Sequence, residues 1–320
     1  MNLKKNILLF FSILLITKSV EAIVTPTDYK KISSVKLISP YHTISKQVQN
    51  IPIGLWITIG KGWHSYWQYP GESGKTLQVK WTLPKDSAVS PLQWPIPERI
   101  HFGSLINFGY KNSFLLMSEL ALPEKKPYKT VTIQAKVEWL ICKEVCVPLT
   151  QSVDLDIPII PTTQKPYKLQ QNINTHWLSE FNRWSAKIPK ISKEKIKLQS
   201  KGTDWLAHIS TPEIRQLVDV FPLSKKTFPL KPPTIVSTNG YKHSFLIKPS
   251  VQENTHHSSN ISKNTHIIAV FKDKENKSSF IYSFEQNKRS FFWFLLLAFL
   301  GGVILNFMPC VLPIVFLKFS

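Results

Sequence analysis

The stretch Val131-Thr-Ile-Gln-Ala-Lys-Val-Glu-Trp-Leu-Ile141 places an apolar side chain at every second position and runs directly into Cys142-Lys-Glu-Val-Cys146. A period of two is typical of a β-strand that turns one face toward a core. The segments 51–59, 77–83 and 153–157 follow the same pattern, and turn-forming stretches separate them. The pattern predicts an all-β fold, an immunoglobulin-like antiparallel sandwich over residues 23–161. Because the immunoglobulin Cys…Trp…Cys spacing is absent, this likeness is one of architecture only.

The chain beyond the sandwich is predicted to contain a linker, residues 162–175, and a second β-rich domain, residues 176–286. Aromatic residues at helical spacing after a candidate cap predict one short helix; the cap is Asn174 or Thr175, and the aromatic residues are Trp177, Phe181 and Trp184. Strand-like runs follow at 205–209, 217–221, 244–247, 266–271 and 279–284. Since this part has no cysteine and no recognisable catalytic cluster, we expect a scaffold or docking role.

Apolar segments lie at both ends of the chain. Residues 1–22 combine Lys4 and Lys5 with an apolar run and end at Ala22, which is the layout of a cleaved secretory signal. Residues 291–317 contain no charged side chain and exceed the roughly 20 apolar residues that a membrane-spanning helix needs. We therefore expect a single-pass membrane protein whose residues 23–290 are exported.

The chain is strongly basic, with forty Lys and Arg against twenty Asp and Glu and a formal net charge of +20. Nucleic-acid-binding proteins share such a charge, but here the lysines are spread along the chain and no zinc-finger, helix-turn-helix or RNP pattern occurs. We expect no nucleic-acid partner. We interpret the charge as a solvated basic surface that favours anionic lipid headgroups or acidic partners.

Two cysteines, Cys142 and Cys146, lie four positions apart in a chain that begins like an exported protein. In an oxidising compartment such a pair forms a disulfide or exchanges one. So small a loop would stabilise folding by only about 2 kcal/mol in the chain-entropy model, which favours a redox role. If Trp139 and Ile141 face the core, Cys142 takes the opposite phase and is expected at the surface.

Residues near the pair are candidates for a supporting role. Lys143 would favour a thiolate at Cys142, and Glu144 would oppose it. The aromatic group around His64 (Trp63, Tyr66 and Trp67) is a candidate cap for the thiols, although core packing explains at least Trp63 or Trp67 equally well. Tyr110 is a further candidate shield. The supporting residues are Trp139, Lys143, Glu144, Tyr110, His64 and Trp67.

Metal binding is the less favoured interpretation of these residues. His256 and His257 lie near His266, but adjacent histidines in a polar loop are more often solvated. Cys142 and Cys146 with a histidine could hold copper(I) or zinc, yet two thiols alone do not complete a zinc tetrahedron. The sequence predicts no cofactor and no metal site.

The third cysteine, Cys310, lies in the C-terminal apolar segment between Pro309 and Pro313. Proline removes a helix hydrogen bond and kinks the helix. A thiol beside such a kink is better exposed to a partner than one on a regular lipid-facing helix.

Several of these stretches resemble the periplasmic N-terminal region of the DsbD/ScsB family of thiol:disulfide interchange proteins. They are Trp139-Leu-Ile-Cys-Lys-Glu-Val-Cys-Val-Pro148, Gly62-Trp-His-Ser-Tyr-Trp67 with Pro70-Gly-Glu-Ser-Gly74, and Trp94-Pro-Ile-Pro-Glu-Arg99. A fourth, Asn306-Phe-Met-Pro-Cys-Val-Leu-Pro313, resembles the first transmembrane helix of that family.

The resemblance implies a protein-disulfide reductase of the bacterial inner membrane, with residues 23–290 in the periplasm and a link to cytochrome c biogenesis. Cys142 and Cys146 would be the terminal exchange pair that reduces periplasmic thioredoxin-fold proteins, and Cys310 one half of a membrane pair. The family also has further transmembrane helices, a second membrane cysteine and a thioredoxin-like domain. As the sequence ends at Ser320, we expect a separate polypeptide to supply them or a truncated copy to lack them. Complete electron transport by this chain alone is not expected.

Two other functions stay open at this point. A copper-handling module would use the same two thiols as ligands. A non-catalytic β-sandwich adaptor would keep Cys142 and Cys146 as a structural disulfide and would not exchange with thioredoxin-fold proteins.

Overall fold

The computed structural model describes residues 31–160, 173–201, 204–223, 232–248, 266–273, 276–285 and 291–306. Several features predicted from the sequence lie outside these residues: the signal segment 1–22, most of the linker, Cys310, and the pair His256 and His257.

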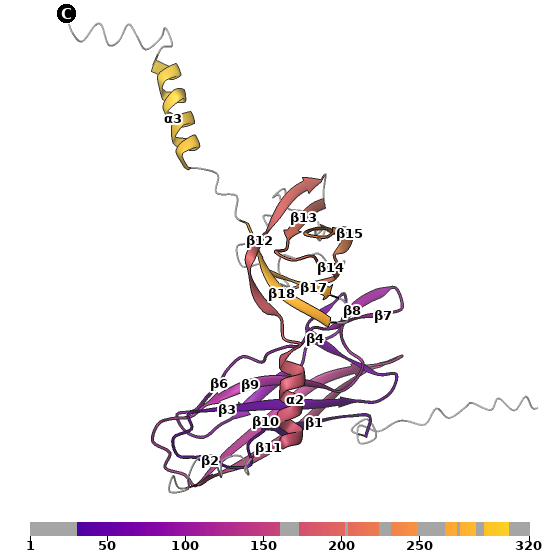
Figure 1. Cartoon of the computed structure of the whole chain (residues 1–320), viewed down its shortest axis with the longest axis vertical. Helices are drawn as coiled ribbons and strands as arrows, with labels where there is room; N and C mark the ends of the chain where they lie inside the picture. Colours follow the sequence, from indigo (N-terminus) through magenta and orange to yellow (C-terminus); the bar gives the residue numbers. More distant parts are fainter. Residues whose placement is uncertain are drawn as a thin grey trace, which may run out of the picture.

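Two sheets pack face to face in the first part of the chain (Figure 1). One sheet has the order β1-β3-β9-β6: β1 (Ser33–Ile38), β3 (Asn50–Ile59), β9 (Phe114–Ala121) and β6 (Ala88–Val89). The other has the order β2-β11-β10-β4-β8-β7: β2 (Ile44–Ser45), β11 (Cys146–Ile160), β10 (Thr130–Cys142), β4 (His64–Gly71), β8 (Leu105–Tyr110) and β7 (Glu98–Phe102). Strand β5 (Gln78–Thr82) also pairs with β10. The predicted all-β sandwich is confirmed, and one pair, β2 with β11, is parallel.

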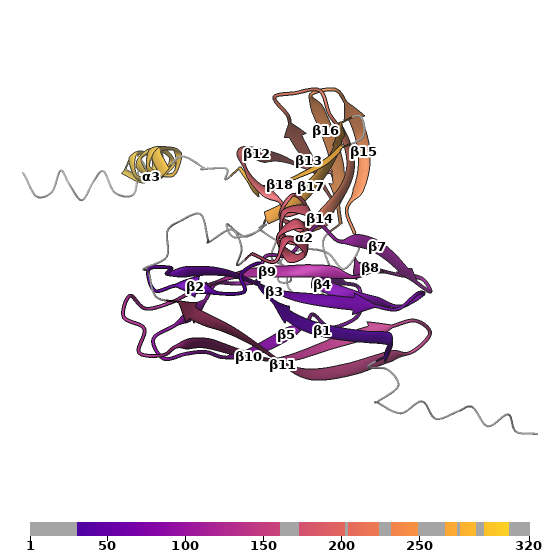
Figure 2. The ribbon, with the colours of Figure 1, turned by 60° about the horizontal axis from the view of Figure 1, so that its bottom comes forward.

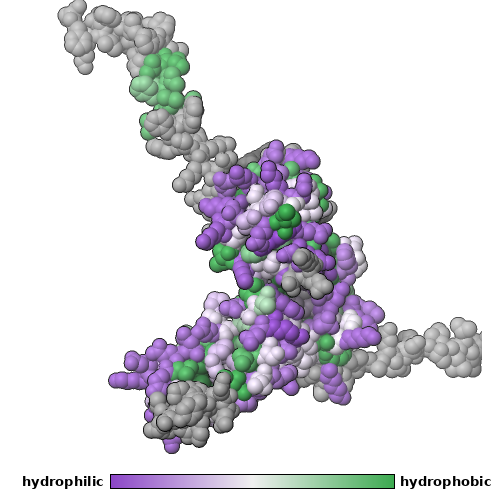
Figure 3. Space-filling model, in the orientation of Figure 1, coloured by the Kyte–Doolittle hydropathy of each residue, from purple (hydrophilic) through white to green (hydrophobic). Residues whose placement is uncertain are grey.

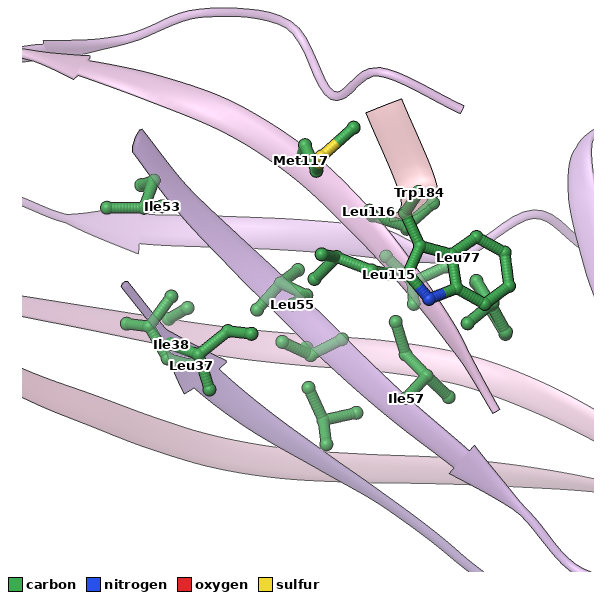
Figure 4. Packing of buried hydrophobic residues seen from close by; sticks show 14 of the residues in the cluster. Leu37, Ile38, Ile53, Leu55, Ile57, Leu77, Leu115, Leu116, Met117 and Trp184 are labelled. Atoms are coloured by element: carbon green, nitrogen blue, oxygen red, sulfur yellow. The ribbon is translucent and has the colours of Figure 1, made fainter. Parts of the chain in front are cut away.

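Apolar side chains at every second position of β3 and β10 fill the space between these sheets. The apolar residues of both strands are almost completely buried, whereas most polar residues between them on β10 are exposed: Ile51, Ile53, Leu55 and Ile57 on β3, and Val131, Ile133, Ala135, Val137, Trp139 and Ile141 on β10. Figure 4 shows residues of β1, β3 and β9 packed together in this core. Burial of this apolar surface is the main driving force for folding of the sandwich.

Helix α2 (Thr175–Ser185) confirms the predicted short helix and covers the sheet that contains β3 and β9 (Figure 1). The side chain of Asn174 caps the helix by accepting a hydrogen bond from the backbone N–H of Trp177 (3.1 Å). Gly54 of β3 leaves room for the helix, because a Cβ there would lie 3.1 Å from the ring of Phe181 and 2.6 Å from Leu115. Phe181 thereby joins the core of the sandwich.

A third sheet of seven strands follows, in the order β14-β17-β18-β12-β13-β16-β15. Its strands are β12 (Lys190–Lys201), β13 (Asp204–Ser210), β14 (Gln216–Pro222), β15 (Thr234–Asn239), β16 (Lys242–Ile247), β17 (His266–Asp273) and β18 (Asn276–Phe284). The pairing of β12 with β18 is parallel, and the other pairs are antiparallel. A separate core lies on one side of this sheet and includes Ile196, Phe245 and Phe271. The second half of the chain is thus β-rich, as predicted.

Helix α3 (Phe291–Asn306) ends the described part of the chain and carries no acidic or basic residue in its terminal turns. No helix among the described residues is long and apolar enough to cross a membrane. The predicted span of residues 291–317 extends past Asn306 into residues outside the described part of the chain.

The third sheet packs on the sandwich beside β7 and β8 (Figure 2). Phe221 of β14 packs against both Trp67 and Phe108 of the sandwich, with ring centroids 6.1 and 5.2 Å away. Arg99 of β7 donates to the carboxylate of Asp219 (2.7 Å) and to the carbonyl oxygen of Val220 (3.1 Å). A buried aromatic cluster and the Arg99–Asp219 ion pair therefore help to join the two halves.

Removal of Arg99 should weaken this junction. Arg99→Ala leaves the Asp219 carboxylate partly buried without its partner, and we expect a loss of about 2 kcal/mol in the free energy of unfolding, measured in urea. Burial raises the pKa of Asp219, and Arg99 only partly opposes that shift. A carboxyl with a raised pKa adds stability while protonated and loses that contribution as pH rises through the folded pKa.

The loss in the free energy of unfolding caused by Arg99→Ala should therefore be larger at about pH 7 than at about pH 4. Arg183→Ala is the matched control, because Arg183 is exposed and pairs with Glu180 on the same helix. That control should cost less than about 1 kcal/mol. Equal losses for the two variants would contradict the role given to Arg99.

Candidate functional site

The two cysteines close the hairpin formed by β10 and β11. Cys142 is the last residue of β10, Cys146 is the first of β11, and the two are direct cross-strand partners. A disulfide joins them, with their Cα atoms 4.1 Å apart. In the three-residue turn between them, the N–H of Lys143 donates to the carbonyl oxygen of Val145 (3.1 Å). The sequence thus places one disulfide at the tip of a long hairpin.

The two sulfur-bearing residues differ in exposure. Cys146 is exposed, whereas Cys142 is 0% exposed. The expectation that Cys142 reaches the surface is therefore wrong. Its alternation phase is opposite to that of Ile141, as expected, but a second strand lies beside it. Cys142 pairs with His64 of β4 as well as with Cys146, so side chains of β4 lie next to it on the outer face of the sheet.

Tyr66 covers Cys142 on that face. It lies two positions after His64 on β4, hence on the same outer face as Cys142. Its hydroxyl donates to Cys142 Sγ (3.0 Å) and lies 3.7 Å from Cys146 Sγ. Burial raises the pKa of Tyr66, which a hydrogen bond with Ser73 partly offsets. The hydroxyl therefore keeps its proton near neutral pH and acts as a donor to sulfur.

The loop after β4 is tied to β8. The backbone N–H of Glu72 donates to the carbonyl oxygen of Ile106 (3.2 Å), and the Glu72 carboxylate accepts from the Ile106 N–H (2.6 Å). The backbone N–H and the hydroxyl of Ser73 donate to Asn107 Oδ1 at 2.9 and 3.0 Å. Asn107 is 0% exposed. These bonds fix the residues that immediately precede Gly74.

Gly74 packs directly on the ring of Tyr66. Its φ is +96°, a backbone conformation that residues with a Cβ rarely adopt. A Cβ at this position would overlap the ring atoms of Tyr66. The stretch Pro70-Gly-Glu-Ser-Gly74 therefore holds Tyr66 over the disulfide.

His64 is the other side chain on this outer face. It is 5% exposed, and its ring meets those of Tyr66 and Phe102 edge to face at centroid distances of 5.3 and 6.1 Å. Burial, with a smaller contribution from Lys111, lowers the pKa of His64. Its Nε2 has no hydrogen-bond partner in the described part of the chain. The imidazole is thus predominantly neutral at neutral pH.

The other predicted supporting residues fall into two groups. Trp67 and Trp139 face the opposite side, into the core, and Trp139 Nε1 donates to the Ser33 hydroxyl (3.0 Å). Tyr110 is also a core residue rather than a shield, since its ring stacks on Phe114 and its hydroxyl donates to the carbonyl oxygen of Pro95 (2.8 Å). Lys143 and Glu144 are exposed in the turn.

Tyr66 is the contact that sequence reasoning left among a group of aromatic candidates. The sequence pattern that separates Tyr66 from Trp67 was present, because the period of two in β4 places His64 and Tyr66 on one face and Ser65 and Trp67 on the other.

No group of three or more His, Cys, Asp or Glu residues that could hold a metal ion occurs among the described residues.

Comparison with known proteins agrees with the sandwich and its disulfide hairpin. Residues 34–158 match the family model described as "Thiol:disulfide interchange protein DsbD, N-terminal". The N-terminal periplasmic domain of ScsB from Proteus mirabilis is similar over 80% of this chain and 92% of its own, with a TM-score of 0.54 and 15% identity. This likeness shows a shared fold.

A chaperone is also among the solved structures that match. The E. coli chaperone DraB aligns over 79% of this chain and 98% of its own, with 10% identity and a TM-score of 0.23. Among curated proteins, none matches the sequence.

Packing of Gly74 on Tyr66 can be tested by substitution. Gly74→Ala should cost at least about 2 kcal/mol more in the free energy of unfolding than Gly103→Ala. Gly103 also has a positive φ (+59°), but an added Cβ there meets no atom within 4 Å. Gly103→Ala therefore measures the cost of backbone strain without a steric overlap. Urea unfolding of both variants gives the difference, and equal losses would show that the ring contact is unimportant.

Proposed function

We propose that the chain, whose residues 34–158 match the N-terminal domain model of the DsbD family, exchanges its Cys142–Cys146 disulfide with partner proteins in the periplasm. The supporting observation is the unequal environment of the two sulfur atoms. Cys146 is exposed at the tip of a hairpin, and Cys142 is buried beneath the Tyr66 hydroxyl. Such an arrangement separates an attacking thiol from a resolving one.

The exposure of Cys146 supports this residue as the one that reacts first. A partner's thiol or disulfide can reach the Sγ of Cys146, whereas the Sγ of Cys142 lies beneath the Tyr66 hydroxyl, and Cys142 pairs with His64 of the neighbouring strand. The residues between the cysteines are exposed, and Val145 is an apolar contact for a partner at 59% exposure. Cys146 is therefore the proposed site of the mixed disulfide.

Reduction of a partner proceeds in two exchanges. The Cys146 thiolate attacks one sulfur of the partner's disulfide, a Cys146–partner bond forms, and the partner's other sulfur leaves as a thiolate that takes up a proton. The Cys142 thiolate then attacks Cys146 Sγ, which restores the Cys142–Cys146 disulfide and releases the second partner thiolate. Two electrons and two protons pass to the partner. The reverse sequence reloads the pair from a reduced donor.

Tyr66 has a direct role in this scheme. A hydrogen bond to an ionised acceptor is stronger than one to a neutral acceptor. The Tyr66 hydroxyl, 3.0 Å from Cys142 Sγ, stabilises the thiolate that leaves when Cys146 is attacked. The neutral imidazole of His64 and the ring of Tyr66 keep water from that side of the sulfur.

The proposed partners are periplasmic thioredoxin-fold proteins, with a thioredoxin-like domain as the electron donor. We propose that residues 1–22 direct export and that residues 291–317 anchor the chain in the bacterial inner membrane, because both segments have the required apolar patterns. Cys310 would belong to a membrane cysteine pair. Residues 23–290 would then lie in the periplasm.

The adaptor alternative rests on the disulfide as a staple. Since the pair closes a loop of only three residues between directly opposed strands, such a staple would add only about 2 kcal/mol. A copper-handling role has less support, because the described part of the chain contains no group of three or more His, Cys, Asp or Glu residues placed to hold a metal ion. The exchange function is therefore preferred.

Single cysteine variants test the proposed order of attack. Cys142→Ser leaves the exposed Cys146 without its resolving partner and should accumulate a stable mixed disulfide with a periplasmic thioredoxin-fold protein. Cys146→Ser keeps only the buried Cys142 and should accumulate little. Non-reducing electrophoresis and mass spectrometry of envelope extracts give both results. Equal trapping by the two variants, or none by either, would contradict the assignment.

The Tyr66 hydroxyl should affect rate rather than fold. Tyr66→Phe removes a hydrogen bond to a charged group and should slow reduction of the disulfide by a dithiol thioredoxin by about tenfold. Stopped-flow fluorescence measures that rate. Tyr110→Phe loses a hydroxyl that bonds to Pro95 instead, and its exchange rate should stay unchanged. Equal slowing of exchange in the two variants would contradict a specific role of the Tyr66 hydroxyl.

A further inference from the structure

We propose that the outer face of β12, β13, β16 and β15 binds the phosphate group of an anionic lipid headgroup. A cavity of about 470 Å³ lies on this face. Its polar lining includes two lysines, two histidines, three serines and one asparagine: Lys197, Lys242, His208, His243, Ser210, Ser237, Ser244 and Asn239. This site lies in the third sheet and is separate from the disulfide.

The strand register groups these side chains. Lys197 pairs with His208, His208 with Ser244, and Ser244 with Ser237, so one row crosses four neighbouring strands. Ser210 and Lys242 are partners in a second row, two residues along β13 and β16. Directly paired residues of a sheet project from the same face, about 5 Å apart. The polar groups therefore lie side by side.

The inner face of the third sheet cannot hold these polar side chains, because it forms the apolar core. Residues that alternate with the polar rows, among them Ile196, Ala207 and Phe245, are 0% exposed in the core of the third sheet. A shift of register by one residue would place lysines in that core. Burial of the apolar face thus fixes the cationic face toward the outside.

The residues that line the cavity favour an anion as its ligand. The cavity has ammonium and imidazole groups together with hydroxyl donors, and no carboxylate lines it. Neither Lys197 nor Lys242 forms an ion pair with another residue in the described ranges. Charged donors with nearby hydroxyls are the groups that bind phosphate oxygens. Figure 3 shows that the visible surface of this sheet is largely hydrophilic.

The path of the chain favours a lipid as the source of the phosphate. The N–H of Glu285 donates to the carbonyl oxygen of Ile196 (2.8 Å), so the chain leaves the sheet next to Lys197. Helix α3 begins at Phe291, and six residue steps can extend at most about 20 Å. If the apolar segment enters a membrane, a step that rests on the proposed function, the cavity lies near headgroups whose negative potential attracts basic residues.

Ligand binding by the full chain in a neutral maltoside detergent tests the proposal. The ligands are dihexanoyl phosphatidylglycerol below its micellar concentration, inorganic phosphate and hexaglutamate, and isothermal titration calorimetry gives each affinity. Lys197→Gln/Lys242→Gln should weaken phosphatidylglycerol binding by at least about tenfold. Lys36→Gln/Lys80→Gln, which removes the same charge from exposed strand positions of the sandwich, should leave it unchanged.

Each other outcome overturns part or all of the proposal. Equal weakening in both double variants would indicate an effect of net charge alone. Binding of inorganic phosphate without phosphatidylglycerol would assign the cavity to a free anion, and cavity-dependent binding of hexaglutamate alone would assign it to an acidic protein. Absence of binding by the unsubstituted chain would remove the site. The assay involves no thiol chemistry, so its failure is distinct from failure of disulfide exchange.

Discussion

The position of Cys142 between two strands is the constraint on which the site depends. As the last residue of β10, Cys142 faces Cys146 on one side and His64 on the other. The first pairing brings the two sulfur atoms together, and the second brings Tyr66 over one of them. Cys146, at the start of β11, keeps its exposed position. One strand register therefore creates the disulfide and makes its two sulfur atoms chemically unequal.

Much of the sandwich could be predicted because many of its strands bury one face only. In β3 and β10 the period of two is clear, and those segments form strands as expected. Strand β9 was not predicted, since Phe114–Met117 are buried in sequence without alternation. Strand β12 was also not predicted, because it has few apolar residues. Five of its twelve residues are lysines, and its alternating apolar pattern is short. The packing of Phe221 against aromatic residues of the sandwich depends on contacts distant in sequence, which no local pattern reveals.

The site was predictable at its thiols and less so around them. Spacing alone identified Cys142 and Cys146, but alternation on one strand cannot show that a side chain of a neighbouring strand covers the outer face. That is why Cys142 was expected at the surface. Tyr66 could have been separated from Trp67 by the same alternation counted from His64. The role of Gly74 depends on a positive φ and on contact with a ring eight residues away, so it required the structure.

The reduction potential of the Cys142–Cys146 couple is the most direct test of the account. The full chain would be equilibrated with glutathione or thioredoxin redox buffers, and the fraction of free thiols would be measured after acid quenching and alkylation. An exchange pair should have a potential above about −300 mV, within the range of thiol–disulfide exchange proteins. A potential well below about −300 mV, the range of structural disulfides, would contradict the exchange function and favour the adaptor.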